Sequence, residues 1–116
     1  MKAETFKLLT KLGLKVSLRG FEIVGESIEL CQSKENFDKY RKNFTSLYRD
    51  LGEKYGSNAA QVERNMRHSI ENAFKEPSNL MIEIFGSEKK RNNKDFVLTL
   101  SKYVELCLDN QNPDLY

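Results

Sequence analysis

The sequence predicts an all-α fold, a compact bundle of five to six helices that contains a helix-turn-helix over about residues 43–74. Apolar residues recur every three or four positions along most of the chain, which is the spacing of a buried helix face. The 116 residues include only six glycines and two prolines, fewer than the turns of a β-sandwich normally need. The length and the 39% of hydrophobic residues fit a single domain, 1–116, with a modest core.

The first quarter of the chain predicts two helices. The first spans about residues 3–12, and Gly13 after it fits the left-handed position that closes a helix. The second spans about residues 20–32 and follows a short connector. The residues that would form the buried faces are Phe6, Leu9 and Leu12 in the first helix and Phe21, Val24, Ile28 and Cys31 in the second.

The next segment predicts the first helix of the helix-turn-helix. Residues 33–36 are polar and predict a turn, and residues 37–41 fit either a short helix or a lead-in. The pattern over residues 43–55 is that of one buried helix face, and Gly56 ends it. Its inward residues are Phe44, Leu47, Tyr48, Leu51 and Tyr55.

The second helix of the motif has clear start and stop signals. Asn58 is a favourable N-cap, and Gln61 stands three residues later, as in a capping box. The helix covers about residues 59–74, because Pro77 cannot continue it. Its inward residues are Val62, Met66, Ile70, Ala73 and Phe74.

The last third of the chain predicts two more helices. Residues 79–85 predict a short helix, and residues 87–93 predict a basic polar loop. The final helix begins near Asn93 or Lys94, and residues 109–116 predict a polar, frayed tail. The inward residues of the final helix are Phe96, Val97, Leu100, Tyr103, Val104 and Cys107.

Several functional classes are not expected. No apolar run is long enough to span a membrane, and the first residues do not form a secretory signal. Cys31 and Cys107 fit two reduced, buried thiols of a cytoplasmic protein, with a disulfide or metal pair as the alternative. We expect no metal and no cofactor, because one histidine and two distant cysteines do not make a zinc site and no phosphate-binding loop is present. We expect no enzyme either, because His68 has no nucleophile or metal set beside it.

The segment 43–74 carries the most specific functional signal. Only about three residues join its two helices, and one of them is glycine, which is typical of a helix-turn-helix. Arginine can bind guanine with two hydrogen bonds in the major groove, and glutamate can accept from cytosine. Mixed charges on a helix are equally typical of a solvated surface, and this alternative stays open. The residues expected on the outward side are Glu63, Arg64, Arg67, His68 and Glu71.

The basic residues are clustered although the net charge is only +2. Such clusters can bind phosphates, which sets affinity and register but not sequence preference. The first cluster contains Lys2, Lys7, Lys11, Lys15 and Arg19; the second contains Lys39, Arg41 and Lys42; the third contains Lys89, Lys90, Arg91 and Lys94.

The second motif helix resembles the recognition helix of the sporulation-initiation response regulator family (Spo-zero-A), in its C-terminal effector domain. The family pattern V-E-R-x-[IM]-R-H-x-I-E is present from Val62 to Glu71. The resemblance covers about residues 5–108. Further similar segments are Leu8 to Gly13 and Arg19-Gly20-Phe21, Leu47-Tyr48-Arg49-Asp50-Leu51, and Ile84-Phe85-Gly86.

The resemblance implies a bacterial, cytoplasmic regulator that binds double-stranded DNA at a box with a GTCGA-like core. It implies tandem or homodimeric binding on DNA and contact with the RNA polymerase sigma factor. Carried onto this chain, Glu63 and Arg64 would read bases, and Arg67 and His68 would bind bases or backbone beside them. The backbone contacts expected with them involve Asn58, Gln61, Lys89, Lys90, Arg91 and Lys94.

The main departure from the family is at the N-terminus. Family members carry a phosphorylated receiver domain ahead of this one, whereas here Met1 precedes the first expected helix almost directly. We therefore expect a stand-alone effector domain, with an excised piece of a longer protein as the other reading. The alternative function is a receiver-less protein-interaction module that modulates a full-length relative or RNA polymerase without specific DNA binding of its own.

Overall fold

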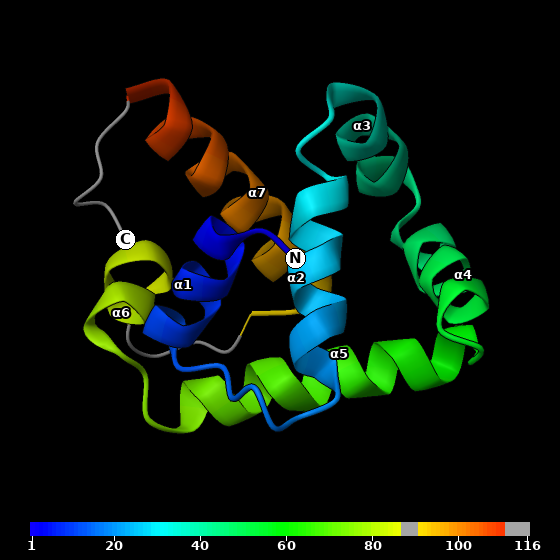
Figure 1. Cartoon of the computed structure of the whole chain (residues 1–116), viewed down its shortest axis with the longest axis horizontal. Helices are drawn as coiled ribbons and strands as arrows, with labels where there is room; N and C mark the ends of the chain where they lie inside the picture. Colours follow the sequence, from blue (N-terminus) through cyan, green and yellow to red (C-terminus); the bar gives the residue numbers. More distant parts are fainter. Residues whose placement is uncertain (87–90, 111–116) are drawn as a thin grey trace.

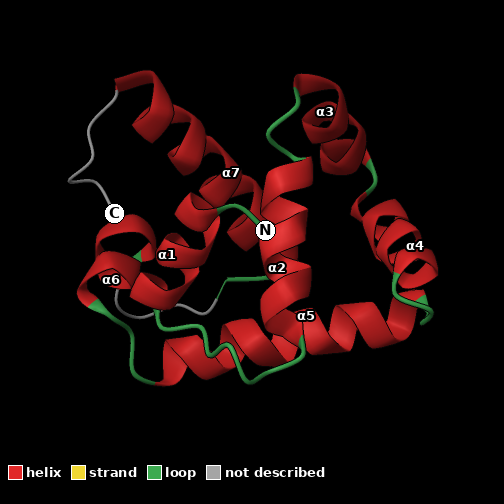
Figure 2. Cartoon of the chain, viewed as in Figure 1, coloured by secondary structure: helices red, strands yellow, loops and turns green. Residues whose placement is uncertain are grey.

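The computed structural model describes residues 1–86 and 91–110, and within these residues it is helical, with no strand (Figure 2). This confirms the predicted all-α class. The basic residues 87–90 and the tail 111–116 lie outside the described residues. The helices are α1 (Ala3–Leu12), α2 (Gly20–Leu30), α3 (Lys34–Lys42), α4 (Phe44–Lys54), α5 (Ala59–Lys75), α6 (Asn79–Phe85) and α7 (Asn93–Asn110).

The described residues form seven helices rather than five or six, because α3 is a full helix. The turn predicted at residues 33–36 is wrong. Ser33 is the N-cap of α3, and its side chain accepts a hydrogen bond from the backbone N–H of Asn36 at 3.0 Å. The polar residues after Ser33 are therefore the first turn of a capped helix, where polar side chains remain in solvent.

Helix α2 lies at the centre of the bundle (Figure 1) and packs against α1, α5 and α7. The apolar stripes predicted for these helices meet in one core, except that Phe6, predicted to be buried, is 44% exposed. The largest fully buried side chains of the core include Leu8, Leu12, Phe21, Met66, Phe96 and Leu100. Cys31 and Cys107 are free and buried at this core, and burial raises the pKa of the Cys31 thiol to about 11, so the thiol form dominates at neutral pH.

The contact between α2 and α5 depends on Gly20. A Cβ atom at this position would overlap the backbone carbonyl of Asn65 and the side chain of Ser69, both on α5. Only glycine allows the first turn of α2 to approach the middle of α5 this closely. The crossing therefore fixes where α5 lies on the core.

Helices α4 and α5 form the predicted helix-turn-helix and cross steeply in Figure 1. Gly56 adopts a left-handed backbone, with φ of 64°, in the connection. The side-chain oxygen of Asn58 accepts from the backbone N–H of Gln61 at 2.9 Å, which confirms Asn58 as the N-cap. The turn thus sets both the direction and the first residue of α5.

Candidate nucleic-acid interface

Helix α5 has one buried face and one exposed face. Val62, Met66 and Ile70 are buried in the core, as predicted. Arg64, Arg67 and His68 are exposed on the outward side, whereas Glu63 and Glu71 are half-buried at its edge. The five predicted outward residues are therefore not equivalent, since only three of them are exposed.

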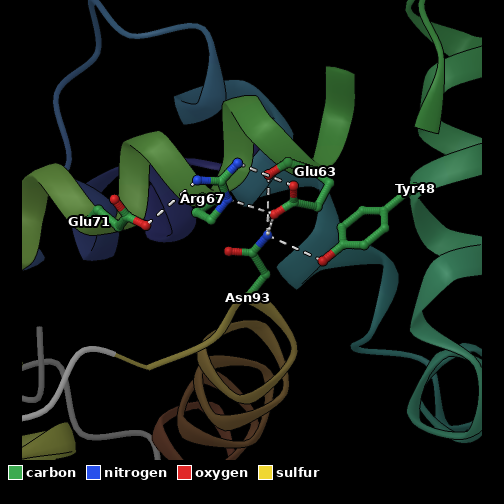
Figure 3. Close-up of polar contacts among 5 residues, drawn as sticks. All are labelled: Tyr48, Glu63, Arg67, Glu71 and Asn93. Carbon is green, nitrogen blue, oxygen red and sulfur yellow. Dashed lines mark hydrogen bonds and ion pairs between the residues drawn. The ribbon is translucent and has the colours of Figure 1, made fainter. Parts of the chain in front are cut away.

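Two carboxylates flank the guanidinium of Arg67 (Figure 3). Its Nε atom lies 2.9 Å from Oε2 of Glu63, and its Nη1 atom lies 3.9 Å from Oε1 of Glu71. The hydrogen bond that Arg67 donates to the Glu63 carboxylate is the main cause that raises the pKa of Arg67. Exposed pairs of this spacing are weak because water screens them, so DNA can compete for the guanidinium.

The charges on this face cancel. Glu63 and Glu71 balance Arg64 and Arg67, so these four side chains together offer no net attraction to a polyanion. Long-range attraction to phosphates therefore has to come from the residues beside the helix.

Basic residues lie along both edges of α5. On the Glu63 edge, a cavity of about 400 Å³ between α4, α5 and the start of α7 is lined by Arg91 and Lys94. On the other edge, Arg19 lines a hollow together with Gln61, and Lys15 lines another together with Lys75. The fold thus brings part of the first and third basic clusters to the edges of α5.

The predicted backbone-binding residues have different surroundings. Asn58 uses its side-chain oxygen for the helix cap, and Gln61 is half-buried. The Arg91 guanidinium donates to the carbonyl of Phe85 at 3.0 Å, and Lys94 is half-buried at the cavity. Lys89 and Lys90 lie outside the described residues.

Asn93 and Tyr48 belong to the site although the sequence did not single them out. The Nδ2 atom of Asn93 lies 3.2 Å from Oη of Tyr48, 3.3 Å from the carbonyl oxygen of Glu63 and 3.5 Å from its Oε2. Asn93 is only 7% exposed, and burial raises the pKa of the Tyr48 phenol. In the sequence, an Asn at the start of a helix suggests only an N-cap. The hydrogen bonds of Asn93 to other helices could therefore not be predicted from the sequence.

The site holds no candidate metal cluster or membrane element in the part of the chain that the structure describes. No group of three or more His, Cys, Asp or Glu side chains there could hold a metal ion. No helix among the same residues is long and apolar enough to cross a membrane. The expectation that no metal is needed stays a prediction.

Comparison with known protein families identifies the fold. The family described as Sporulation initiation factor Spo0A C terminal matches residues 5–104, which run from α1 into α7 and include the whole helix-turn-helix. The chain belongs to this family. The Spo0A C-terminal family is a family of DNA-binding effector domains that regulate transcription in sporulation, not an enzyme family. No curated protein matches the chain.

Membership in the Spo0A C-terminal family confirms the resemblance inferred from the residues between Val62 and Glu71. It also gives the chain a function class, since a Spo0A C-terminal domain is a DNA-binding domain. Which residues of this chain contact bases, and which box they prefer, are not given by the family match.

Proposed function

We propose that this chain is a sequence-specific transcriptional regulator, a single effector domain that places α5 in the major groove of a GTCGA-like box. The observation that carries the proposal is that Arg64 and His68 are exposed, one turn apart, on a capped helix that follows a short turn. A helix presented in this way can enter the groove and bring side chains to base edges.

The roles proposed for the four base-reading candidates follow from their exposure and chemistry. Arg64 is free to form two hydrogen bonds with a guanine, and His68 lies one turn further along. Glu63 and Arg67 act beside them as an ion pair, from the edge nearest α7. Arg19, Lys15, Arg91 and Lys94 bind phosphates on the two sides and supply the affinity that the neutral face of α5 lacks.

The proposed partners are double-stranded DNA and, as the resemblance implies, the RNA polymerase sigma factor. One small domain covers one box, so two copies on adjacent boxes, in tandem or as a homodimer, would bind more tightly than one. The proposed location is the bacterial cytoplasm, where its DNA partner lies.

The proposal is tested by fluorescence anisotropy with a duplex that contains a GTCGA box and a scrambled duplex, over a range of salt concentrations. We expect the unaltered chain to prefer the box at every salt concentration. Arg64→Ala should reduce that preference by about 1–3 kcal/mol, the value of one bidentate contact. Its effect on the scrambled duplex should be small.

Arg41→Ala is the matched control. Arg41 is exposed on α3, at the opposite end of the molecule from α5 in Figure 1, and its removal deletes one positive charge as well. It should leave the box preference unchanged. If the unaltered chain bound both duplexes equally, the proposal would fail, and the protein-interaction module would be the better account.

A further inference from the structure

Asn93 connects three helices at the edge of the candidate interface. It is the first residue of α7, outside the helix-turn-helix, yet its amide contacts Tyr48 on α4 and Glu63 on α5. Figure 3 shows the amide between these two side chains, with Arg67 on the far side of the Glu63 carboxylate. One buried amide thus connects both helices of the motif with a helix that is not part of it.

The hydrogen-bonding capacity of this amide limits its orientation. Nδ2 carries two hydrogens, and its nearest acceptors are Oη of Tyr48 at 3.2 Å and the carbonyl oxygen of Glu63 at 3.3 Å. Rotating the side chain would leave a donor unpaired at a position that is 7% exposed, which is costly. In this orientation, Nδ2 also lies 3.5 Å from Oε2 of Glu63, the oxygen that accepts from Arg67.

We propose that Asn93 is a positioning residue for DNA recognition. It holds the Glu63 carboxylate against the start of α7, so that Glu63 anchors Arg67 instead of extending over the groove. This inference rests on the proposed function, because it concerns the sequence preference of the same helix. Asn93 itself touches no base.

The expected effect of losing this amide follows from charge. A carboxylate that is no longer held can swing toward the phosphates, where it repels DNA, and Arg67 loses its fixed partner. We expect Asn93→Ala to lower the ratio of box binding to scrambled binding by about tenfold, the equivalent of one buried hydrogen bond. Binding to the scrambled duplex should change by about twofold or less, since the phosphate-binding residues remain.

The matched control is Gln32→Ala. Gln32 also has a side-chain amide that contacts α7, through a hydrogen bond of 3.2 Å to the carbonyl of Ser101, but it is half-buried and its hydrogen bonds go to α2 and α7 and not to α5. Both variants should lower the melting temperature, and only Asn93→Ala should lower the binding ratio. An equal ratio for Asn93→Ala and the unaltered chain would overturn the inference.

A double-mutant cycle with Glu63→Gln separates positioning from general loosening of the fold. If Asn93 acts through the charge of Glu63, Asn93→Ala should have little further effect on the ratio in the Glu63→Gln background. Additive losses would contradict the inference. If circular dichroism shows that Asn93→Ala does not fold, Tyr48→Phe replaces it, because this variant removes one acceptor of the amide and keeps the ring. Tyr48→Phe should also lower the ratio of box binding to scrambled binding. An unchanged ratio would contradict the inference.

The outcomes also separate this inference from the proposed function. If the unaltered chain shows no box preference, the proposed function fails. If it prefers the box and Asn93→Ala retains the full preference, only the positioning role fails.

Discussion

Two of the helices that pack against α5, namely α2 and α7, contact it in different ways. Against α2, the contact is steric: Gly20 lies on the backbone of Asn65, and apolar side chains fill the core around it. Against α7, the ring of Phe74 contacts the ring of Phe96, and the contact at Glu63 is polar and consists of one buried amide. The steric contact fixes the place of the helix, whereas the polar contact fixes the orientation of a charged side chain on its surface.

The difference indicates that stability and sequence preference can be altered separately in this domain. Loss of the contact with α2 should destabilise the fold as a whole. Loss of the contact with α7 should alter binding more than stability. Three substitutions, two of them paired with a control, test whether stability and sequence preference can be altered separately, from the largest expected effect to the smallest.

Gly20→Ala should have the largest effect on stability. The added methyl group overlaps backbone atoms of α5, which cannot move without shifting a helix. We expect the free energy of unfolding, measured by urea denaturation, to fall by about 1–3 kcal/mol, as for other overpacked cores.

Gly25→Ala is the control in the same helix. A methyl group there meets the flexible end of the Met1 side chain, which can move away. The substitution should be neutral or slightly stabilising, since alanine favours a helix over glycine. If Gly20→Ala and Gly25→Ala lost equal unfolding free energy, the close approach of Gly20 to α5 would not explain the loss.

Asn58→Ala removes the N-cap of α5 and should cost about 1 kcal/mol of unfolding free energy, because a backbone N–H loses its partner. Ser33→Ala removes a similar cap from α3 and should cost a similar amount. Thermal denaturation measures both losses. Only Asn58→Ala should also weaken binding to the box, and weaker binding by Ser33→Ala would argue against a local role of the cap.

The smallest expected effect on stability concerns a polar contact away from the exposed face of α5. Tyr55 donates a hydrogen bond of 2.8 Å to Glu26, and burial, followed by this carboxylate, raises the pKa of the phenol to about 12 from 10.0. A raised pKa means that the folded state favours the protonated phenol. The contribution of Tyr55 to the free energy of unfolding is therefore complete below pH 10 and is lost as the pH rises to about 12.

We expect Tyr55→Phe to reduce the steepness of this loss of stability between pH 10 and 12, measured by urea denaturation at several pH values. Tyr55 is 43% exposed, so the difference should be small. Box preference at neutral pH should be unchanged. An identical pH profile for both chains would show that the hydrogen bond to Glu26 does not contribute.

The sequence predicted most of the fold because each helix has its own local signals. Gly13, Gly56 and Pro77 mark helix ends, and the spacing of Val62, Met66 and Ile70 gave the buried face of α5 correctly. The turn at residues 33–36 was mistaken because a cap and a turn use the same polar residues. Local patterns therefore identify elements better than they separate caps from loops.

The candidate site was predicted less completely, because its geometry depends on contacts between distant segments. The residue types on α5 indicated DNA recognition, and the family match supports that class. Nothing in the order of the residues places Asn93 beside Glu63, thirty residues earlier, or indicates that Glu63 is half-buried. These facts arise only when α7 packs against the helix-turn-helix.

The most direct test of the central claim, that α5 presents Arg64 to bases, is methylation interference on the GTCGA-like box. Methylation of guanine at N7 blocks the atom that arginine contacts in the major groove. The account predicts that methylation of one guanine in the box weakens binding by the unaltered chain, and that Arg64→Ala is insensitive to it. Equal sensitivity in both chains, or none in the unaltered chain, would contradict the account.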